Sequence, residues 1–196
     1  MQTEINWHDT RFRNEILAYK YLIENFETSD VTDKDCRDSF GRNFQRTCND
    51  YFHNGRVAQA LGTPTLLEHY KLLEMYKKSP NRPDFKKALL DLYTQTGKTS
   101  VFLASQVAHF FNSDMPICSR FVLNGLNTTV TNTDISTACD DYEHLVKLVH
   151  EFRDSNIGQE IIRSFRESFN ERINRNISDT KIIDFYFWFM ALDKGE

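Results

Sequence analysis

The sequence predicts an all-α fold, in a single compact domain that covers residues 1–196. Apolar residues recur along most of the chain at the spacing near 3.6 that is typical of amphipathic helices. Glycine and proline are scarce, with 7 and 4 residues, which favours long elements and short loops. No alternating segment is long enough for a sheet, and a chain of this length can bury one full hydrophobic core.

Helices are predicted in the first half of the chain from apolar periodicity and from cap residues. The second of them follows the cap candidates Asp30 and Thr32, carries Cys36 to Phe52 on its apolar side, and ends at Asn54-Gly55. A proline at a first helical turn opens the third, because proline is tolerated there. The four predicted ranges are 10–26, 33–53, 64–79 and 83–93.

The second half begins with a helix over residues 98–111, which a short turn joins to the helix before it, so the two form a helical hairpin. A short helix follows Pro116, and residues 127–133 form a polar loop. Asp134 caps a long helix that ends near residue 152. Helices are also expected over 157–173 and 179–192. The last is apolar nearly all round, which predicts a central, buried position.

Composition excludes several function classes. The net charge of −4 means that nucleic-acid binding would need a local basic face. Four cysteines (Cys36, Cys48, Cys118 and Cys139) show no CxxC pair or zinc-type spacing, which predicts reduced thiols in a cytoplasmic protein. The chain has no signal-peptide pattern and no membrane-spanning apolar run. The histidines are scattered, so we expect no metal site and no cofactor.

Three local features have structural interpretations that outweigh the functional ones. Gly97-Lys98-Thr99 resembles the end of a phosphate loop, but Leu92 stands where the first glycine should be and no strand precedes it. His109 lies within an apolar helix, which favours a hydrogen-bonded core histidine over a catalytic one. Cys118 follows Pro116 at a helix start, and a small buried thiol is favoured there over a reactive one.

Two segments carry a family resemblance. Residues 97–126 read GKTSVFLASQVAHFFNSDMPICSRFVLNGL and residues 181–190 read KIIDFYFWFM. They are similar to the central signature and the closing helix of a divergent branch of the helix-hairpin-helix DNA glycosylase-like superfamily. The matching residues are Gly97, Ala104-Ser105, His109-Phe110, Asn112, Asp114, Pro116-Ile117, Ser119, Ile183-Asp184 and Trp188.

The resemblance implies a DNA-binding protein of the DNA-repair type. In that superfamily the hairpin binds one DNA strand through backbone amides at its glycine turn, a mode that needs no strongly basic protein. The DNA-binding residues implied here are Thr96, Gly97, Thr99, Ser119 and Arg120. Lys98 matches the lysine that can form a Schiff base with the sugar, and the target base is flipped into a pocket between helices.

The sequence departs from the family at the aspartate that assists glycosidic cleavage. None of the residues from Ile117 to Arg120 is a carboxylate, and one hairpin glycine is also absent. Either Asp114, or a carboxylate from elsewhere such as Asp140, acts with Lys98, or the chain kept the fold and lost the chemistry.

Two hypotheses follow. One is a DNA N-glycosylase or lyase with Lys98 and Asp114 as catalytic residues. The other is a non-catalytic helical module that binds a protein or nucleic-acid partner. They differ in whether a carboxylate lies within reach of the Lys98 amine.

Overall fold

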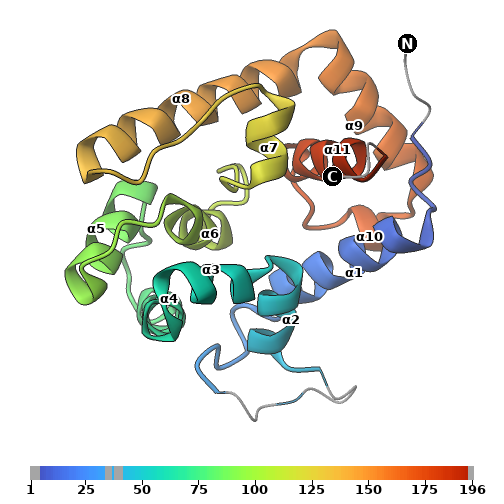
Figure 1. Cartoon of the computed structure of the whole chain (residues 1–196). Coiled ribbons are helices and arrows are strands. Elements are labelled where there is room, and N and C mark those ends of the chain that lie inside the picture. The colour runs from blue at the N-terminus through green and yellow to red at the C-terminus, as the bar shows by residue number, and fades with distance from the viewer. Residues whose placement is uncertain (1–4, 34–36, 38–41, 194–196) are drawn as a thin grey trace.

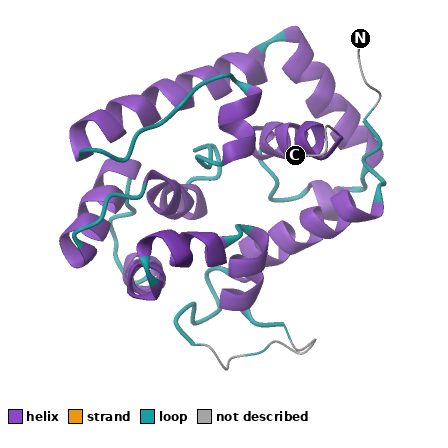
Figure 2. Ribbon diagram, in the orientation of Figure 1, coloured by secondary structure: helices purple, strands orange, loops and turns teal. Residues whose placement is uncertain are grey.

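The computed structural model describes residues 5–33, 37 and 42–193, and this part of the chain is all-helical and without strands (Figure 1, Figure 2). It folds into eleven helices over these residues. Their bounds are α1 (Thr10–Asn25), α2 (Phe44–Tyr51), α3 (Asn54–Leu61), α4 (Thr63–Lys77), α5 (Phe85–Thr96), α6 (Val101–Phe111), α7 (Arg120–Gly125), α8 (Ile135–Asp154), α9 (Asn156–Ser168), α10 (Glu171–Asn174) and α11 (Asp179–Asp193).

The all-α prediction is confirmed, and most of the predicted helices are present. The helices with strong periodicity and a clear start signal in the sequence lie close to their predicted ranges. They are α1, α4, α5, α6, α8 and α11. The Asp134 carboxylate accepts a hydrogen bond from the backbone N–H of Thr137, as expected of an N-cap. The loop over residues 127–133 contains no strand.

The predicted helix over residues 33–53 is wrong at the described residues that precede Phe44, namely Asp33, Arg37, Arg42 and Asn43, which are not helical. Asp30 accepts hydrogen bonds from the backbone and hydroxyl of Thr32, which makes a turn there instead of a helix start. The helix begins only at Phe44, where the Asn43 side chain accepts from the backbone N–H of Arg46. Cys36, which was predicted on this helix, lies outside the described residues.

Two further boundaries differ from the prediction. Asn54-Gly55 begins helix α3 instead of ending one, because His53 takes the left-handed conformation at φ 54° and separates α2 from α3. The helix predicted over 157–173 is two helices, because the Asn170 side chain caps α10 by accepting from the N–H of Ile173. Apolar periodicity therefore predicted single helices in places where a left-handed residue or a capping side chain begins a second helix.

Helix α11 is central, as predicted. It packs against α7, α8 and α9, and Ile182 and Ile183 are fully buried within it. Figure 1 shows α7 directly beside α11. The close approach needs a glycine at Gly125, because a Cβ atom there would overlap the ring of Phe187.

Helices α4, α5, α6 and α8 build the other side of the core. Helix α5 packs against α4, α6 and α8, and the ring of Phe85 stacks on that of Tyr142 at 3.7 Å between centroids. Helices α5 and α6 are consecutive, packed together and joined by a short turn at Gly97. None of the described helices combines the length and the hydropathy needed to cross a membrane.

Candidate functional site

The turn between α5 and α6 holds three of the residues predicted to bind DNA: Thr96, Gly97 and Thr99. Gly97 takes the left-handed conformation at φ 66°, and its N–H donates to the carbonyl of Tyr93 at 2.7 Å. The Lys98 N–H donates to the Thr96 hydroxyl at 3.2 Å. At the start of α6 the Val101 N–H donates to the Asn132 side chain at 2.9 Å. These three backbone amides therefore already have acceptors within the chain.

The side chain of Lys98 is exposed, and its Nζ donates to the carbonyl of Leu61 at 2.6 Å, at the end of α3. No carboxylate of the described residues lies within ion-pairing distance of this amine. Thr99 lines a shallow surface groove of about 300 Å³ between α3 and the turn, together with Arg56 and Asn132. Lys98 thus lies beside α3, without a carboxylate partner.

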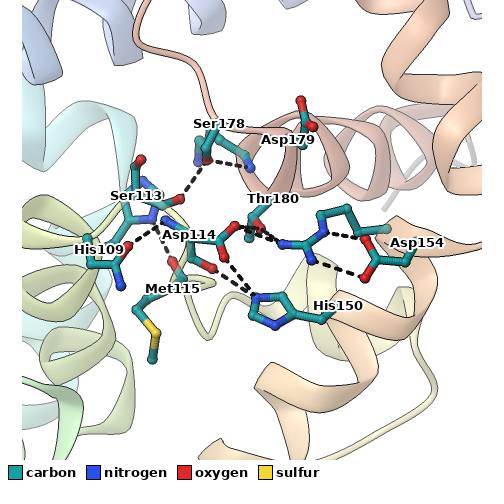
Figure 3. A network of polar contacts seen from close by, with 12 residues as sticks. His109, Ser113, Asp114, Met115, His150, Asp154, Ser178, Asp179 and Thr180 are labelled. Carbon is teal, nitrogen blue, oxygen red and sulfur yellow. Dashed lines mark hydrogen bonds and ion pairs between the residues drawn. The ribbon is translucent and has the colours of Figure 1, made fainter.

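Asp114 lies in a polar cluster that joins the loop after α6 to α8 and α11 (Figure 3). Its carboxylate accepts from the Thr180 hydroxyl at 2.7 Å and from the Arg153 guanidinium at 2.8 Å, and His150 Nε2 lies 3.7 Å away. Burial raises the pKa of Asp114, but the hydrogen bond from Thr180 and the charge of Arg153 outweigh it, so the pKa is lower than usual. The carboxylate is ionised and is held by residues of two helices, α8 and α11.

Lys98 and Asp114 lie at opposite ends of α6. Lys98 precedes the first turn of this 11-residue helix and Asp114 follows its last. At 1.5 Å per residue the helix separates them by roughly 16 Å. The structure therefore does not bring the two predicted catalytic residues together.

The other residues of the quoted signature anchor the loop that follows α6. The Ser105 hydroxyl accepts from the N–H of Cys118 at 3.0 Å and donates to the carbonyl of Phe102 at 2.8 Å. His109 Nδ1 lies 2.7 Å from the carbonyl of Met115, so it carries the proton, and Nε2 accepts from the Tyr19 hydroxyl at 2.8 Å. Burial lowers the pKa of His109 to about 3, so the ring is neutral. His109 is a hydrogen-bonded core histidine.

Cys118, which stands near the missing aspartate, is buried, and burial raises the pKa of its thiol to about 12. The thiol is therefore protonated at neutral pH and unsuited to nucleophilic chemistry. Cys48 and Cys139 are also free and buried.

A half-open pocket lies where α1, α6, α7 and α11 converge. It contains about 60 Å³, room for a few water molecules. Its polar lining includes the ion pair of Lys181 and Asp184 and the carboxylate of Glu15. Rings form most of the remaining wall, and the aromatic lining residues are Tyr51, Phe52, His53, Phe102, Phe121, Phe185 and Trp188.

A lysine–carboxylate pair thus lies next to the helix that follows Pro116, but it is Lys181 with Asp184. Neither residue was predicted as a site residue, because KIIDFYFWFM was interpreted as a buried closing helix and Asp184 only as part of its match to the family. The available signal was a lysine and an aspartate three residues apart in a helix that is apolar nearly all round. Lys181 is 1% exposed, and charged residues are almost never buried to that extent without a partner.

Of the predicted residues, Ser119 lines this pocket, and Arg120 follows it as the first residue of α7. Ser119 lines the pocket and caps α7 by accepting from the N–H of Val122 at 3.3 Å. The Arg120 guanidinium lies over the Phe121 ring at 4.7 Å. Burial, and then the nearby charges of Arg56 and Arg120, lower the pKa of His53, which also lines the pocket.

Three exposed cations therefore lie on α3 or near it, and we call them the basic rim: Arg56 within α3, Lys98 with its amine on the Leu61 carbonyl, and Arg120, whose charge acts on His53 together with that of Arg56. Within the described part of the chain none of them has a carboxylate at ion-pairing distance.

The described residues contain no group of three or more histidine, cysteine, aspartate or glutamate side chains that could hold a metal ion. Comparison with known proteins finds no matching family model, no matching curated protein and no matching solved structure.

Proposed function

We propose that this protein binds DNA through the basic rim, as a non-catalytic relative of the helix-hairpin-helix DNA glycosylases. The observation that carries the proposal is the gathering of Arg56, Lys98 and Arg120, without carboxylate partners, on a chain whose net charge is −4. Exposed cations without carboxylate partners suit a phosphate backbone, whose binding is governed by local positive charge. The packed α5–α6 pair with its glycine turn supports the same assignment.

The contacts to phosphate in this proposal come from side chains. The family resemblance leads us to expect phosphate binding by backbone amides at this turn. The amides of Gly97, Lys98 and Val101 donate within the chain, so few are free to bind phosphate. Arginine is suited to the role, because its planar guanidinium matches phosphate oxygens in bidentate geometry. Thr99 and Ser119 add hydroxyl groups beside the cations.

Lys98 has no catalytic role in this proposal because of the groups that surround its amine. Its amine donates to the carbonyl of Leu61, and Asp114 lies at the other end of α6 with its carboxylate held by Thr180 and Arg153. A Schiff-base nucleophile needs a base or a desolvated site to lose its proton, and Lys98 has neither. In this proposal Lys98 is a phosphate contact.

The proposal is tested by fluorescence anisotropy with a labelled DNA duplex over a range of salt concentrations. We expect affinity to fall with salt, and the slope of log K against log salt to decrease by about one when Arg56 or Arg120 is replaced by alanine. Lys147→Ala is the matched control, because Lys147 is an exposed cation on α8 that pairs with Glu151. DNA binding that is absent at low salt, or equally weakened by the control, would contradict the proposal.

The non-catalytic part has its own test. Borohydride trapping on duplexes that contain an abasic site should give no covalent adduct that disappears in Lys98→Ala. An adduct that depends on Lys98 would restore the glycosylase or lyase hypothesis.

A further inference from the structure

A second group of cations lines a groove between α1 and α10, and none of them belongs to the basic rim. The groove is half-open and contains about 590 Å³, within the size range of small-molecule sites. Figure 1 shows α10 next to α1. The charged lining residues described by the structure are four cations, Arg13, Lys20, Arg42 and Arg172, and one carboxylate, Glu24. This excess of positive charge, on a chain whose net charge is −4, attracts anions to the groove.

Lys20 is the buried cation of the groove. It is 7% exposed, and its amine forms an ion pair with Glu24, which is its one acceptor among the described residues. A lysine ammonium carries three N–H donors, and buried donors are normally satisfied. Two donors of Lys20 are therefore left for the oxygen atoms of water or of a ligand in the groove.

The arginines reach the groove from three parts of the chain. Arg13 on α1 and Arg172 on α10 are exposed, and neither has a carboxylate within ion-pairing distance among the described residues. The Arg42 guanidinium precedes α2 and lies over the ring of Tyr21 at 5.3 Å, where cation–π attraction helps to position it. Guanidinium groups match phosphate oxygens in bidentate geometry. Cations from three segments suit a ligand with more than one phosphate group.

The burial of Lys20 favours a small ligand over a duplex. The phosphates of duplex DNA lie along a long, convex surface, which suits exposed cations such as those of the basic rim. A lysine that is 7% exposed is better reached by the end of a short chain of phosphate groups. Leu17 and Ile173 line the same groove, and Leu17 is 37% exposed. These two side chains offer apolar contact to a group attached to the phosphates.

We propose that this groove binds an oligophosphate group, either free or carried by a nucleoside triphosphate, with Arg13, Lys20 and Arg172 as its contacts. The test is isothermal titration calorimetry with inorganic tripolyphosphate at about 0.15 M salt, at which exposed charges more than about 8 Å apart are largely screened. We expect saturable binding at one site per chain, with a Kd below about 1 mM. Absence of saturable binding would overturn the proposal.

Paired arginine variants separate the groove from diffuse positive charge. Arg13→Gln/Arg172→Gln should weaken tripolyphosphate binding at least about tenfold, the equivalent of one charge-assisted hydrogen bond. The matched control is Arg163→Gln/Arg175→Gln, which removes the same charge from two exposed arginines that do not line the groove. The control should change the Kd by less than about twofold, because distant charges are screened. Equal weakening by the two double variants would overturn the proposal.

Replacement of Glu24 tests the contact with Lys20 through an effect of the opposite sign. Glu24→Gln removes the carboxylate that competes with phosphate for the amine, so tripolyphosphate should bind at least about threefold more tightly. Glu27→Gln is the matched control, because Glu27 is an exposed carboxylate that pairs with Arg82 and does not line the groove. The control should leave the affinity unchanged. Unchanged or weaker binding by Glu24→Gln would contradict the contact with Lys20.

Two further measurements identify the source of the phosphates and separate the groove from the proposed DNA surface. Binding of ATP at least about fivefold tighter than that of tripolyphosphate would identify a nucleotide as the source, through apolar contacts of its nucleoside. Equal affinity would identify a free oligophosphate, and either result supports the groove. The rim variant Arg56→Ala/Arg120→Ala should lose DNA affinity and keep tripolyphosphate affinity, and Arg13→Gln/Arg172→Gln should show the reverse. Loss of DNA binding by the groove variant would make the groove part of a DNA surface and overturn the proposal.

Discussion

Replacing His69 and His109 in turn by leucine should change the free energy of unfolding in opposite directions. Both imidazoles are fully buried, and burial lowers the pKa of each to about 3, so both are neutral at pH 7. His109 hydrogen-bonds to the Tyr19 hydroxyl and the Met115 carbonyl. Both ring nitrogens of His69 lack a partner among the described residues.

The magnitudes follow from what each variant leaves behind. Leucine at position 109 leaves Tyr19 and Met115 each with an unpaired polar group, at about 1–3 kcal/mol for each, so the loss is about 2–6 kcal/mol. Leucine at position 69 removes two unsatisfied nitrogens and leaves none behind, so we expect a gain of about 1–2 kcal/mol.

The assay is urea unfolding at pH 7 followed by circular dichroism. With a slope of about 2 kcal/mol per molar urea, the two midpoints should differ by at least about 1.5 M. Equal destabilisation by both substitutions would refute the reasoning, since it would mean that His69 has hydrogen-bond partners as strong as those of His109.

Three further predictions concern buried charge, backbone conformation and pH. Lys181→Met leaves the largely buried carboxylate of Asp184 without its cation and should cost about 3 kcal/mol in urea unfolding, and a cost near zero would show that the pair is solvated. Gly97→Ala should lower stability by about 1 kcal/mol, because alanine is strained at φ 66°. Gly55→Ala, within α3 and with no atom near the added Cβ, should raise the melting temperature or leave it unchanged. The folded pKa of about 3 for His69 and His109 lies below the unfolded value, so the unfolded chain binds more protons. Stability should therefore fall from pH 6.5 towards pH 3 by up to about 1.4 kcal/mol per unit for each ring, and imidazole signals that titrate near pH 6.5 in the folded protein would contradict this.

The fold could be predicted where local signals agreed and not where distant contacts decided. Periodicity and caps were sufficient for α1, α4, α6, α8 and α11. Asn54 was interpreted as a helix end because Asn-Gly favours turns. Its side-chain amide donates to Tyr70 at 3.4 Å and accepts from Gln106 at 3.0 Å, in a buried network that spans α3, α4 and α6. No local pattern reports such partners, so α3 was missed.

Some residues of the candidate site could likewise be predicted from local sequence, and others depend on distant contacts. Ser119 and Arg120 were predicted from their place in a motif; Ser119 lines an aromatic pocket, and the Arg120 guanidinium lies over the ring of Phe121, which also lines it. Lys98 was predicted from the same motif, but its role depends on which carboxylate lies near it, and that is a property of the packing. Glu15 and Lys181 are 166 residues apart in the sequence and meet only because α1 and α11 converge.

The Lys181–Asp184 pair should be costly to break and yet add little stability over apolar side chains. A buried ion pair is often no more stabilising than a pair of apolar side chains of similar volume, and Lys181 is 1% exposed in an otherwise apolar helix. The double variant Lys181→Met/Asp184→Leu separates the two effects. We expect it to unfold within about 1–2 kcal/mol of the natural protein, unlike Lys181→Met alone.

A double variant that is as unstable as Lys181→Met alone would contradict this expectation. It would show that the two charges contribute to folding through contacts other than each other.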